Sequence, residues 1–430
     1  MNKRSLTRRD FLHSTTLAAT GFWFSLRNPW HRRPSPNEKL NIGIIGTANR
    51  AQTNIAGVAS QIIVALCDID DNYLAAAARK FPGAATYNDF RKLLDQKNVD
   101  AVVISTADHT HAAAAVAALR SGLHVYCEKP LSHNVAEARL LSRMAAKYKC
   151  ATQMGTQIHA GNNYRRVVEL IQSGAIGPVT ECHVWCDKSW SGGQRPLEQP
   201  HIPSSLHWDL WLGPAPERPY HPAYLPANWR RWWDFGNGTL GDMGCHYLDL
   251  AHWALNLRHP LTIDTEGPPV HPETTPPWLI VHYEYAARDT LPPVRVSWYD
   301  GGKRPTGILA DNVPNWRNGV LFVGKKGMLL ADYEHRRLLP ESDFTDFVPP
   351  TPWIPDSIGH YQEWLQACKT GSPTTCNFDY AGALSEAVLL GNVAYRSGRK
   401  LEWDAALLKF KNCNEAINYI HPEYRKGWLM

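Results

Sequence analysis

The sequence predicts an α/β protein with two domains: an N-terminal doubly wound parallel sheet and a C-terminal α+β domain with an open, mostly antiparallel sheet. Between residues 40 and 155, short apolar runs alternate with helical segments, as in repeated strand–helix–strand units. After Gly155 the pattern changes to a long stretch rich in Pro and Trp, followed by strand-like segments and two late helices. We therefore expect a signal and linker over residues 1–38, a first domain over 39–155 and a second over 156–430.

The first domain contains five candidate strands, over residues 40–46, 62–68, 101–106, 124–128 and 151–155. Each is almost continuously apolar, as expected for parallel strands that helices cover on both faces. Thr110 is expected to cap an alanine-rich helix that ends at Gly122, and Asn134 with Glu137 predicts a second helix start.

The second domain is expected to begin with a helix over residues 162–173 and a strand over 179–186. Residues 187–237 are predicted to be irregular. Sheet segments follow at 279–285, 294–299, 319–323 and 328–332, and helices at 359–369 and 379–397.

The charge balance excludes some classes of partner. The 430 residues include 45 basic and 40 acidic side chains, a formal net charge of +5. Residues 1–33 hold seven basic side chains against Asp10, so the rest of the chain carries about −1. We therefore expect no nucleic-acid partner and no anionic-membrane partner.

The N-terminus resembles a twin-arginine (Tat) export signal. Arg8 and Arg9 precede Asp10, Phe11 and a mildly apolar run that reaches residue 26. No apolar stretch has the roughly 18 residues that a transmembrane helix needs, so no stable membrane anchor is expected apart from this signal. The nine cysteines show no disulfide or zinc spacing and are expected to be buried thiols. We expect export by the Tat machinery, in the folded state, to the periplasm; an accidental basic tail is the alternative.

The turn that follows the first strand predicts a dinucleotide site. Gly46, Ala48 and Ala51 occupy the three positions of the G-x-G-x-x-G/A pattern, and Ala48 departs from it because its methyl group intrudes where the pyrophosphate approaches. The expected cofactor contacts in the turn are Gly46, Thr47, Ala48, Asn49 and Arg50. Asp68, at the end of the second strand, suits a ribose 2′-hydroxyl and repels a 2′-phosphate, which favours NAD over NADP.

The end of the third strand is expected to line the same crevice. We assign Ser105, Thr106, Asp108, His109 and His111 to cofactor binding, because strand ends near the switch point of such sheets face the ligand. The two histidines also allow a metal interpretation, but no further ligands lie nearby in the sequence, so no metal site is predicted.

Four further segments resemble the glucose–fructose oxidoreductase/inositol dehydrogenase (Gfo/Idh/MocA) family. They are Glu-Lys-Pro at 128–130, Gln-Met-Gly-Thr-Gln at 153–157, Gly-x-Leu-x-Asp-x-Gly-x-His at 238–246 and Asn-Phe-Asp-Tyr-Ala-Gly at 377–382. The resemblance extends over the chain after residue 38. It is specific for the family and not for a substrate. It implies an N-terminal Rossmann domain that binds NAD and a C-terminal substrate and oligomerisation domain.

The resemblance implies roles for three catalytic residues, Lys129, Asp242 and His246. Lys129 would lie beside the nicotinamide and polarise the reacting oxygen, His246 would be the general base or acid, and Asp242 would orient the imidazole or the reacting hydroxyl. Spacing of four residues puts Asp242 and His246 on one face of a helix, whose start Thr239 is expected to cap. Glu128 would position the lysine strand, and Gln157 joins the cofactor contacts. A metal interpretation of Asp242, His246, Asp249 and His252 is set aside.

The irregular stretch offers substrate contacts. Its many Trp side chains suit either sugar rings or a local core, and both alternatives stay open. The candidate substrate residues are His159, Lys188, Trp190, Asn228, Trp229 and Arg230, with His207 as a weaker candidate.

The sequence therefore predicts an exported oxidoreductase, with NAD (less favourably NADP) tightly bound. It would move hydride between the cofactor and a secondary hydroxyl of a sugar, cyclitol or glycoside. A redox-neutral glycoside hydrolase or lyase that uses transient oxidation is one alternative. A non-catalytic carbohydrate-binding protein is another. The resemblance also implies a homo-oligomer.

Overall fold

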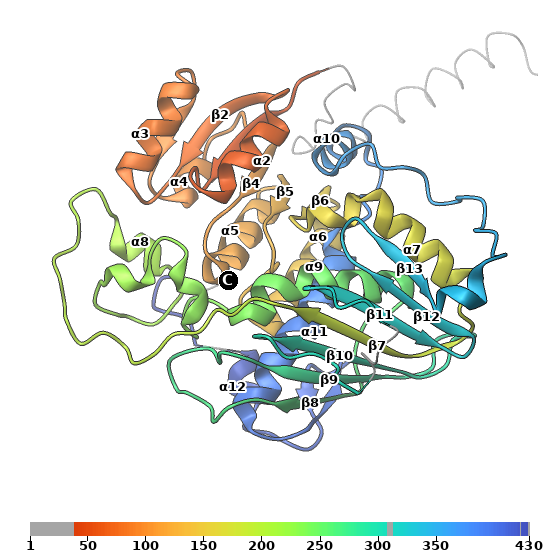
Figure 1. Cartoon of the computed structure of the whole chain (residues 1–430). Coiled ribbons are helices and arrows are strands. Elements are labelled where there is room, and N and C mark those ends of the chain that lie inside the picture. Colours follow the sequence, from red (N-terminus) through yellow and green to blue (C-terminus); the bar gives the residue numbers. More distant parts are fainter. Residues whose placement is uncertain (1–37, 308–312, 422, 429–430) are drawn as a thin grey trace, which may run out of the picture.

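The structure is a computed structural model that describes residues 38–307, 313–421 and 423–428. The chain forms two sheets with helices between and around them (Figure 1). The predicted Tat-type segment lies outside the described residues. Among the described residues, no helix is both long and apolar enough to cross a membrane.

The first sheet is parallel and six-stranded, in the order β3-β2-β1-β4-β5-β6. The reversal of strand order lies between β1 and β4, which pair directly. The strands are β1 (Asn41–Ile45), β2 (Ile62–Cys67), β3 (Ala85–Tyr87), β4 (Ala101–Ile104), β5 (His124–Cys127) and β6 (Thr152–Met154). The helices between them are α2 (Arg50–Val58), α3 (Asp71–Lys80), α4 (Phe90–Leu94), α5 (Asp108–Arg120) and α6 (Val135–Tyr148). The doubly wound sheet predicted from the sequence is thus confirmed.

Three local predictions in this domain had different outcomes. Strand β3 was not predicted, because its three residues are half-buried or exposed and show no apolar run. The capping pair at α6 is confirmed: Asn134 Oδ1 accepts from the Glu137 N–H at 3.1 Å, and Glu137 Oε2 accepts from the Asn134 N–H at 3.2 Å. The Thr110 cap is wrong, because α5 already begins at Asp108 and the Thr110 hydroxyl donates to the Ala107 carbonyl inside the helix.

The second sheet has nine strands in the order β13-β12-β11-β7-β10-β9-β8-β14-β15. It is antiparallel except where β7 and β10 pair in parallel, in agreement with the predicted open, mostly antiparallel sheet. The strands are β7 (Val179–Cys186), β8 (Thr262–Glu266), β9 (Ile280–Tyr285), β10 (Val294–Asp300), β11 (Gly319–Gly324), β12 (Gly327–Ala331), β13 (Arg336–Leu339), β14 (Leu401–Asp404) and β15 (Lys409–Phe410).

The helices of the second domain connect the two sheets. The longer ones are α7 (Asn162–Gln172), α9 (Gly238–Ala254), α10 (His360–Thr370) and α11 (Phe378–Ser397), and the short ones are η1 (Gln157–Ala160), α8 (Trp208–Leu212), η2 (Pro222–Tyr224), η3 (Asn228–Arg231), η4 (Glu341–Phe344) and α12 (Ile417–Ile420). Helix α9 lies between the first domain and the nine-stranded sheet (Figure 1). Helix α11 packs on α6, and α10 packs on α2. At that last contact a side chain on Gly57 would overlap the Tyr361 ring, so glycine is required there. Late segments of the chain therefore return to the first domain.

The Trp-rich stretch forms a small core of its own. Trp208 and Trp211 stack with ring centroids 4.6 Å apart, and Tyr224, Trp232 and Phe235 pack around them. These side chains are buried. Of the two alternatives for this stretch, these rings therefore form a local core.

All nine cysteines are free thiols, and all but the half-buried Cys150 are buried, as predicted. Within the described part of the chain, no three His, Cys, Asp or Glu side chains are grouped so that they could hold a metal ion.

Candidate active site

The first half of the site lies at the carboxyl ends of β1, β2, β4 and β5. Gly46 follows β1 with φ 84°, and a Cβ there would lie 2.6 Å from the Ser105 carbonyl oxygen. Only glycine fits this turn, because it tolerates both the positive φ and the contact with the strand beside it. The turn leads directly into α2.

The N-terminus of α2 suits a pyrophosphate. Its capping residue, Asn49, makes no side-chain hydrogen bond to the helix, and the positive end of the helix dipole faces the turn, which favours an anion there. Asp68 follows β2, and its Oδ2 accepts from both the N–H and the hydroxyl of Thr47, each at 2.8 Å. Ser105 and Thr106 follow β4. The residues present therefore fit a dinucleotide.

The Glu128 carboxylate links the start of α2 to the segment that follows β6. Its Oε1 accepts from Arg50 Nε at 3.1 Å, from Asn54 Nδ2 at 2.9 Å and from Gln157 Nε2 at 3.1 Å. A side chain on Gly155 would lie 2.7 Å from this carboxylate. The carboxylate, which follows β5, thus joins the first turns of α2 to Gln157 at the start of η1.

Lys129 and Asp242 form the centre of the site. Lys129 Nζ donates to Asp242 Oδ1 at 2.8 Å and to the Asp242 carbonyl at 2.6 Å. Lys129 comes from the end of β5 and Asp242 from the second turn of α9. An ammonium group has three donors, so one N–H of Lys129 remains for a third acceptor.

Two further side chains donate to the same carboxylate. Arg230 Nε donates to Oδ1 at 2.9 Å, and the Trp190 indole N–H donates to Oδ2 at 2.8 Å. Burial by itself would raise the pKa of Asp242, but the charges of Lys129 and Arg230 outweigh that effect and hold the pKa well below its usual range. Asp242 is therefore an anion that fixes the lysine.

His246 lies one turn of α9 after Asp242. The Thr156 hydroxyl donates to the Cys245 carbonyl at 3.0 Å, and its oxygen lies 3.3 Å from His246 Nδ1. Because that hydroxyl hydrogen is used, its oxygen can accept from Nδ1–H, which leaves Nε2 of His246 with the free lone pair. Burial, and then the charge of Lys129, lower the pKa of His246 to about 3. The imidazole of His246 is therefore neutral at physiological pH.

Asp108 is a second carboxyl group in this environment. It lies at the start of α5, is buried and accepts a hydrogen bond from Asn237. Burial raises the pKa of Asp108 to about 7, against the opposing charges of Arg230 and Lys129. It therefore changes its charge near neutrality, which His246 does not.

The two neighbouring histidines have other partners. His109 has Nε2 2.8 Å from the Trp211 carbonyl and Nδ1 3.3 Å from the Phe235 carbonyl. His111 has Nδ1 2.8 Å from the Pro130 carbonyl and Nε2 3.1 Å from the Thr106 carbonyl. Both rings are buried against main chain, so their placement indicates a structural role for the two side chains.

The predicted substrate residues divide into two groups. Trp190, Arg230 and Lys188 surround Asp242, with Lys188 Nζ 3.9 Å from Oδ2. Trp229 is buried under the Arg230 guanidinium, whose carbon lies 4.2 Å from the ring centroid, and Asn228 lies in the same turn.

His159 is not brought to the Asp242 carboxylate. Its Nδ1 lies 2.9 Å from Asp249 Oδ1, and its ring stacks on Trp253 with centroids 4.2 Å apart. The weaker candidate His207 faces Asp71 on the surface.

Several side chains of the site were not predicted. Thr156, Asn54 and Arg231 were passed over because hydroxyl, amide and guanidinium groups carry no spacing signal of their own. The Thr239 cap is also wrong: α9 starts at Gly238, and the Thr239 hydroxyl accepts from the Trp190 N–H at 2.7 Å. The Gln-Met-Gly-Thr-Gln segment could have pointed to Thr156, since it contains that residue.

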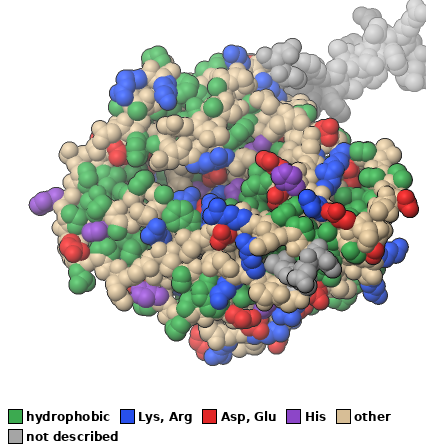
Figure 2. Space-filling view, viewed as in Figure 1, with side chains coloured by type: hydrophobic (Ala, Val, Ile, Leu, Met, Phe, Trp, Pro, Cys, Tyr) green, Lys and Arg blue, Asp and Glu red, His purple; other side chains and the backbone are tan. Residues whose placement is uncertain are grey.

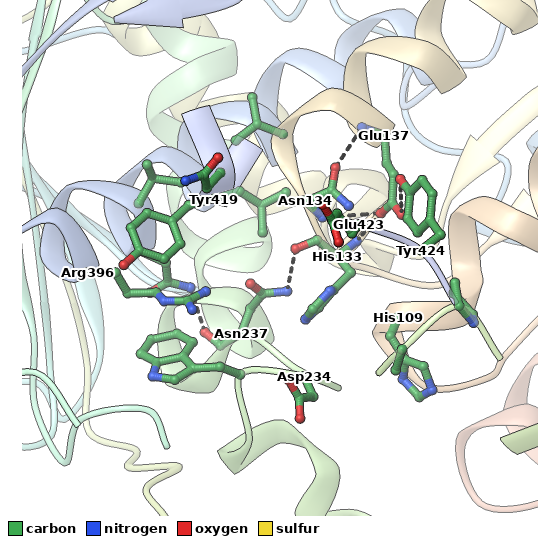
Figure 3. Close-up of a pocket in the computed structure, with 18 of the residues that line it drawn as sticks. His109, His133, Asn134, Glu137, Asp234, Asn237, Arg396, Tyr419, Glu423 and Tyr424 are labelled. Atoms are coloured by element: carbon green, nitrogen blue, oxygen red, sulfur yellow. Dashed lines mark hydrogen bonds between the residues drawn. The ribbon is translucent and has the colours of Figure 1, made fainter. Parts of the chain in front are cut away.

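A separate cavity of about 220 Å³ has Asn237 in its wall (Figure 3). Its walls include His133, Asn134 and Glu137 from the α6 start and Arg396 from α11. Neither Lys129, Asp242 nor His246 lines it. The hollow near the centre of Figure 2 instead lies between the two domains, with Lys and Arg side chains on its rim.

Two family models match the chain. Residues 40–156 match the model described as "Oxidoreductase family, NAD-binding Rossmann fold", and residues 163–291 match the one described as "Oxidoreductase family, C-terminal alpha/beta domain". Both are models of the Gfo/Idh/MocA family, and together they span more than half of the chain.

Similar proteins include the inositol 2-dehydrogenase of Salmonella paratyphi B, 33% identical over 148 residues, which are 34% of this chain and 43% of that protein. The levoglucosan dehydrogenase of Pseudarthrobacter phenanthrenivorans is 24% identical over 233 residues, 50% of this chain and 51% of that protein. The chain thus spans about half the length of the curated relatives it matches.

Among solved structures, the WlbA dehydrogenase from Bordetella pertussis in complex with NADH and UDP-GlcNAcA has a TM-score of 0.63 and 17% identity. The match covers 86% of this chain and 99% of that one, and it supports the fold. Taken with the two family models and the observed strand order, it leads to one assignment: the chain belongs to the Gfo/Idh/MocA family of oxidoreductases.

Proposed function

We propose that this protein is an NAD-dependent dehydrogenase that oxidises a secondary hydroxyl of a sugar or cyclitol. The observation that carries the proposal is the Lys129 ammonium group held on the Asp242 carboxylate, one helical turn before a neutral His246. The inositol and levoglucosan dehydrogenases that the chain resembles support the substrate class.

The residues that would hold NAD are those of the turn at 46–50, with Asp68, Ser105, Thr106 and Gln157 around it. NAD, when bound, supplies the hydride acceptor. The Asp68 carboxylate suits an unmodified ribose, because it would repel a 2′-phosphate.

The chain's own groups handle the hydroxyl. The remaining N–H of Lys129 donates to the substrate oxygen and stabilises the negative charge that develops there. Nε2 of His246 accepts the hydroxyl proton. NAD, when held by the residues named above, would take up the hydride from the same carbon, so that the alcohol becomes a carbonyl. Asp242 keeps Lys129 charged and oriented.

Replacing Lys129 with Met tests this proposal. We expect kcat for NADH formation to fall by about 100-fold or more, because the variant loses the cation that faces the alkoxide-like oxygen. Asp242 keeps Arg230 and Trp190 as partners, so the melting temperature should change little.

The control is Lys147→Met, which removes a lysine from the far end of α6. Unchanged turnover in Lys129→Met would exclude the lysine from the chemistry. Aryl alcohol released from aryl glycosides without NADH accumulation would indicate the redox-neutral alternative.

We also propose export by the Tat machinery to the periplasm, with NAD already bound, and self-association. The free thiols support folding in a reducing compartment before export. Cell fractionation of an Arg8→Lys, Arg9→Lys variant tests export, since an unchanged periplasmic fraction would exclude this route. Light scattering of the purified protein tests self-association, and a mass of one chain would exclude it.

A further inference from the structure

The cations around Asp242 outnumber the anions. Lys129 and Arg230 both donate to Oδ1, and Lys188 Nζ lies 3.9 Å from Oδ2, so one carboxylate faces three positive side chains. Oδ2 is already used by the Trp190 indole. Asp108, the other carboxyl group beside Lys129 and Arg230, has a pKa of about 7. Even when it is ionised, two carboxylates face three cations, so this part of the crevice keeps a positive charge.

Lys188 has only weak partners of its own. Its hydrogen-bond acceptor is Met243 Sδ at 3.3 Å, and a thioether is a weak acceptor. Its side chain is 53% exposed, which leaves the ammonium group available at the mouth of the site.

Arg231 is a further cation beside Trp190. Its guanidinium carbon lies 5.6 Å from the centroid of the Trp190 ring. Among the described residues its side chain has neither a hydrogen-bond nor an ion-pair partner, and its Nε is shielded from solvent. The nearby acids Asp234 and Glu273 are already paired with Arg195 and Arg218.

The surroundings hold these groups in place. The Trp190 N–H donates to Thr239 Oγ1 at 2.7 Å, and Thr275 Oγ1 donates to the Trp190 carbonyl at 2.7 Å. The Thr275 N–H also donates to the Arg231 carbonyl at 2.9 Å. One threonine therefore fixes both Trp190 and Arg231 beside the catalytic carboxylate, as expected of a site built before its ligand arrives.

We propose that the substrate is a sugar that carries an oxyanion, a carboxylate or a sulfate ester, which Lys188 and Arg231 bind beside the Asp242 carboxylate. This inference rests on the proposed dehydrogenase function and names its substrate class. Arginine and lysine suit such a group because charge-assisted hydrogen bonds to an oxyanion are the strong ones.

Matched pairs of sugars test the proposal on the NAD-loaded protein: glucose, glucuronate and glucose 6-sulfate, and the same three forms of galactose. We expect kcat/KM for an acidic form to exceed that of its neutral partner by about tenfold or more, since one charge-assisted hydrogen bond supplies that much. A preference for glucuronate alone would identify a carboxylate as the group bound. A preference for both acidic forms would show that a sulfate ester is accepted as well.

Variants locate the binding group. Arg231→Gln and Lys188→Gln should each lower the ratio of kcat/KM for the acidic sugar to kcat/KM for its neutral partner about tenfold. Arg231→Lys should restore part of the loss, because it keeps the charge. Lys147→Gln is the matched control: it removes a cation that lies over Tyr148 at the C-terminal end of α6, which leads to the amino end of β6 and not to the carboxyl ends of the strands.

A binding measurement provides the second readout. Quenching of tryptophan fluorescence in the NADH-loaded protein should show tighter binding of glucuronate than of glucose, weakened by salt and by Arg231→Gln, with NADH affinity unchanged. Equal or better use of neutral sugars, or variants that slow both forms alike, would overturn the inference while the dehydrogenase proposal stands. Failure of every sugar to reduce NAD would overturn the dehydrogenase proposal instead.

Discussion

At the scale of single residues, the role of Asp242 depends on which side chains donate hydrogen bonds to its two carboxylate oxygens. Two donors share Oδ1 and the indole donates to Oδ2, so three of the four lone-pair sites of the ionised carboxylate are already engaged. Asp242 is therefore better suited to holding Lys129 than to proton transfer, which leaves His246 Nε2 for that role.

The group that titrates near neutrality is Asp108. Below pH 7 its carboxyl is neutral, and above pH 7 it becomes an anion beside Lys129 and Arg230, which weakens the positive potential at the reacting oxygen. We expect the ratio of kcat/KM between the wild type and Asp108→Asn to fall as the pH rises from 6 to 8. The measurement is a pH series of NADH formation for both proteins.

A ratio that stays constant over that range would show that Asp108 does not act on the site. His246 should contribute no change there, because its pKa of about 3 keeps the imidazole neutral throughout.

At the scale of elements, the turn between β1 and α2 makes a sharp prediction. In Gly46→Ala the new methyl group would lie 2.6 Å from the Ser105 carbonyl, and the positive φ costs an alanine about 1–2 kcal/mol. We expect NADH to bind about tenfold more weakly and the melting temperature to fall. Fluorescence titration with NADH and thermal unfolding measure the two effects.

Gly83→Ala is the control for that change. A side chain at Gly83 would meet nothing within 4 Å, so both NADH affinity and stability should match the wild type. Normal NADH affinity in Gly46→Ala would mean that this turn does not hold the cofactor.

The elements themselves were largely predictable, and their ends were not. The parallel strands and the 162–172 helix can be recognised in the sequence, because their buried positions are apolar and recur with the period of a strand or a helix. The two capping predictions at Thr110 and Thr239 failed because both helices begin earlier, and each hydroxyl finds a different main-chain partner. A threonine near a helix start satisfies several geometries, and only the packing around it selects one.

At the scale of the whole molecule, buried ionisable groups set the pH dependence of stability. Burial lowers the pKa of five histidines to about 3 or 4: His109, His133, His246, His252 and His360. Burial raises the pKa of three carboxyl groups to about 7: Asp108, Glu137 and Asp300.

These shifts predict that the free energy of unfolding is greatest near pH 6.5. Between about pH 4.5 and 6.5 the unfolded chain binds five histidine protons that the native state lacks, and the native state keeps three carboxyl protons. Two net protons favour the unfolded state there, so stability rises with pH. Between pH 6.5 and 7 only the carboxyl groups remain, and the contribution of their raised pKa is lost as pH rises.

Urea unfolding at pH 5, 6.5 and 8 checks this expectation. Two variants test the two sides of this maximum separately. His252→Gln should reduce the loss of unfolding free energy below pH 6.5, and Glu137→Gln should reduce the loss above it. A midpoint that rises steadily from pH 5 to 8 would contradict the assignment.

The sequence by itself determined the parallel sheet and the turn at Gly46, because an apolar strand and a glycine turn are patterns of neighbouring residues. Its resemblance to the family pointed to Lys129, Asp242 and His246 as candidate catalytic residues. The tertiary structure alone decided the state of those groups. The charge of Asp242, the neutral His246, the titrating Asp108 and the unpaired Arg231 depend on burial and on partners from distant segments, and a pKa or an ion pair has no value until those segments meet.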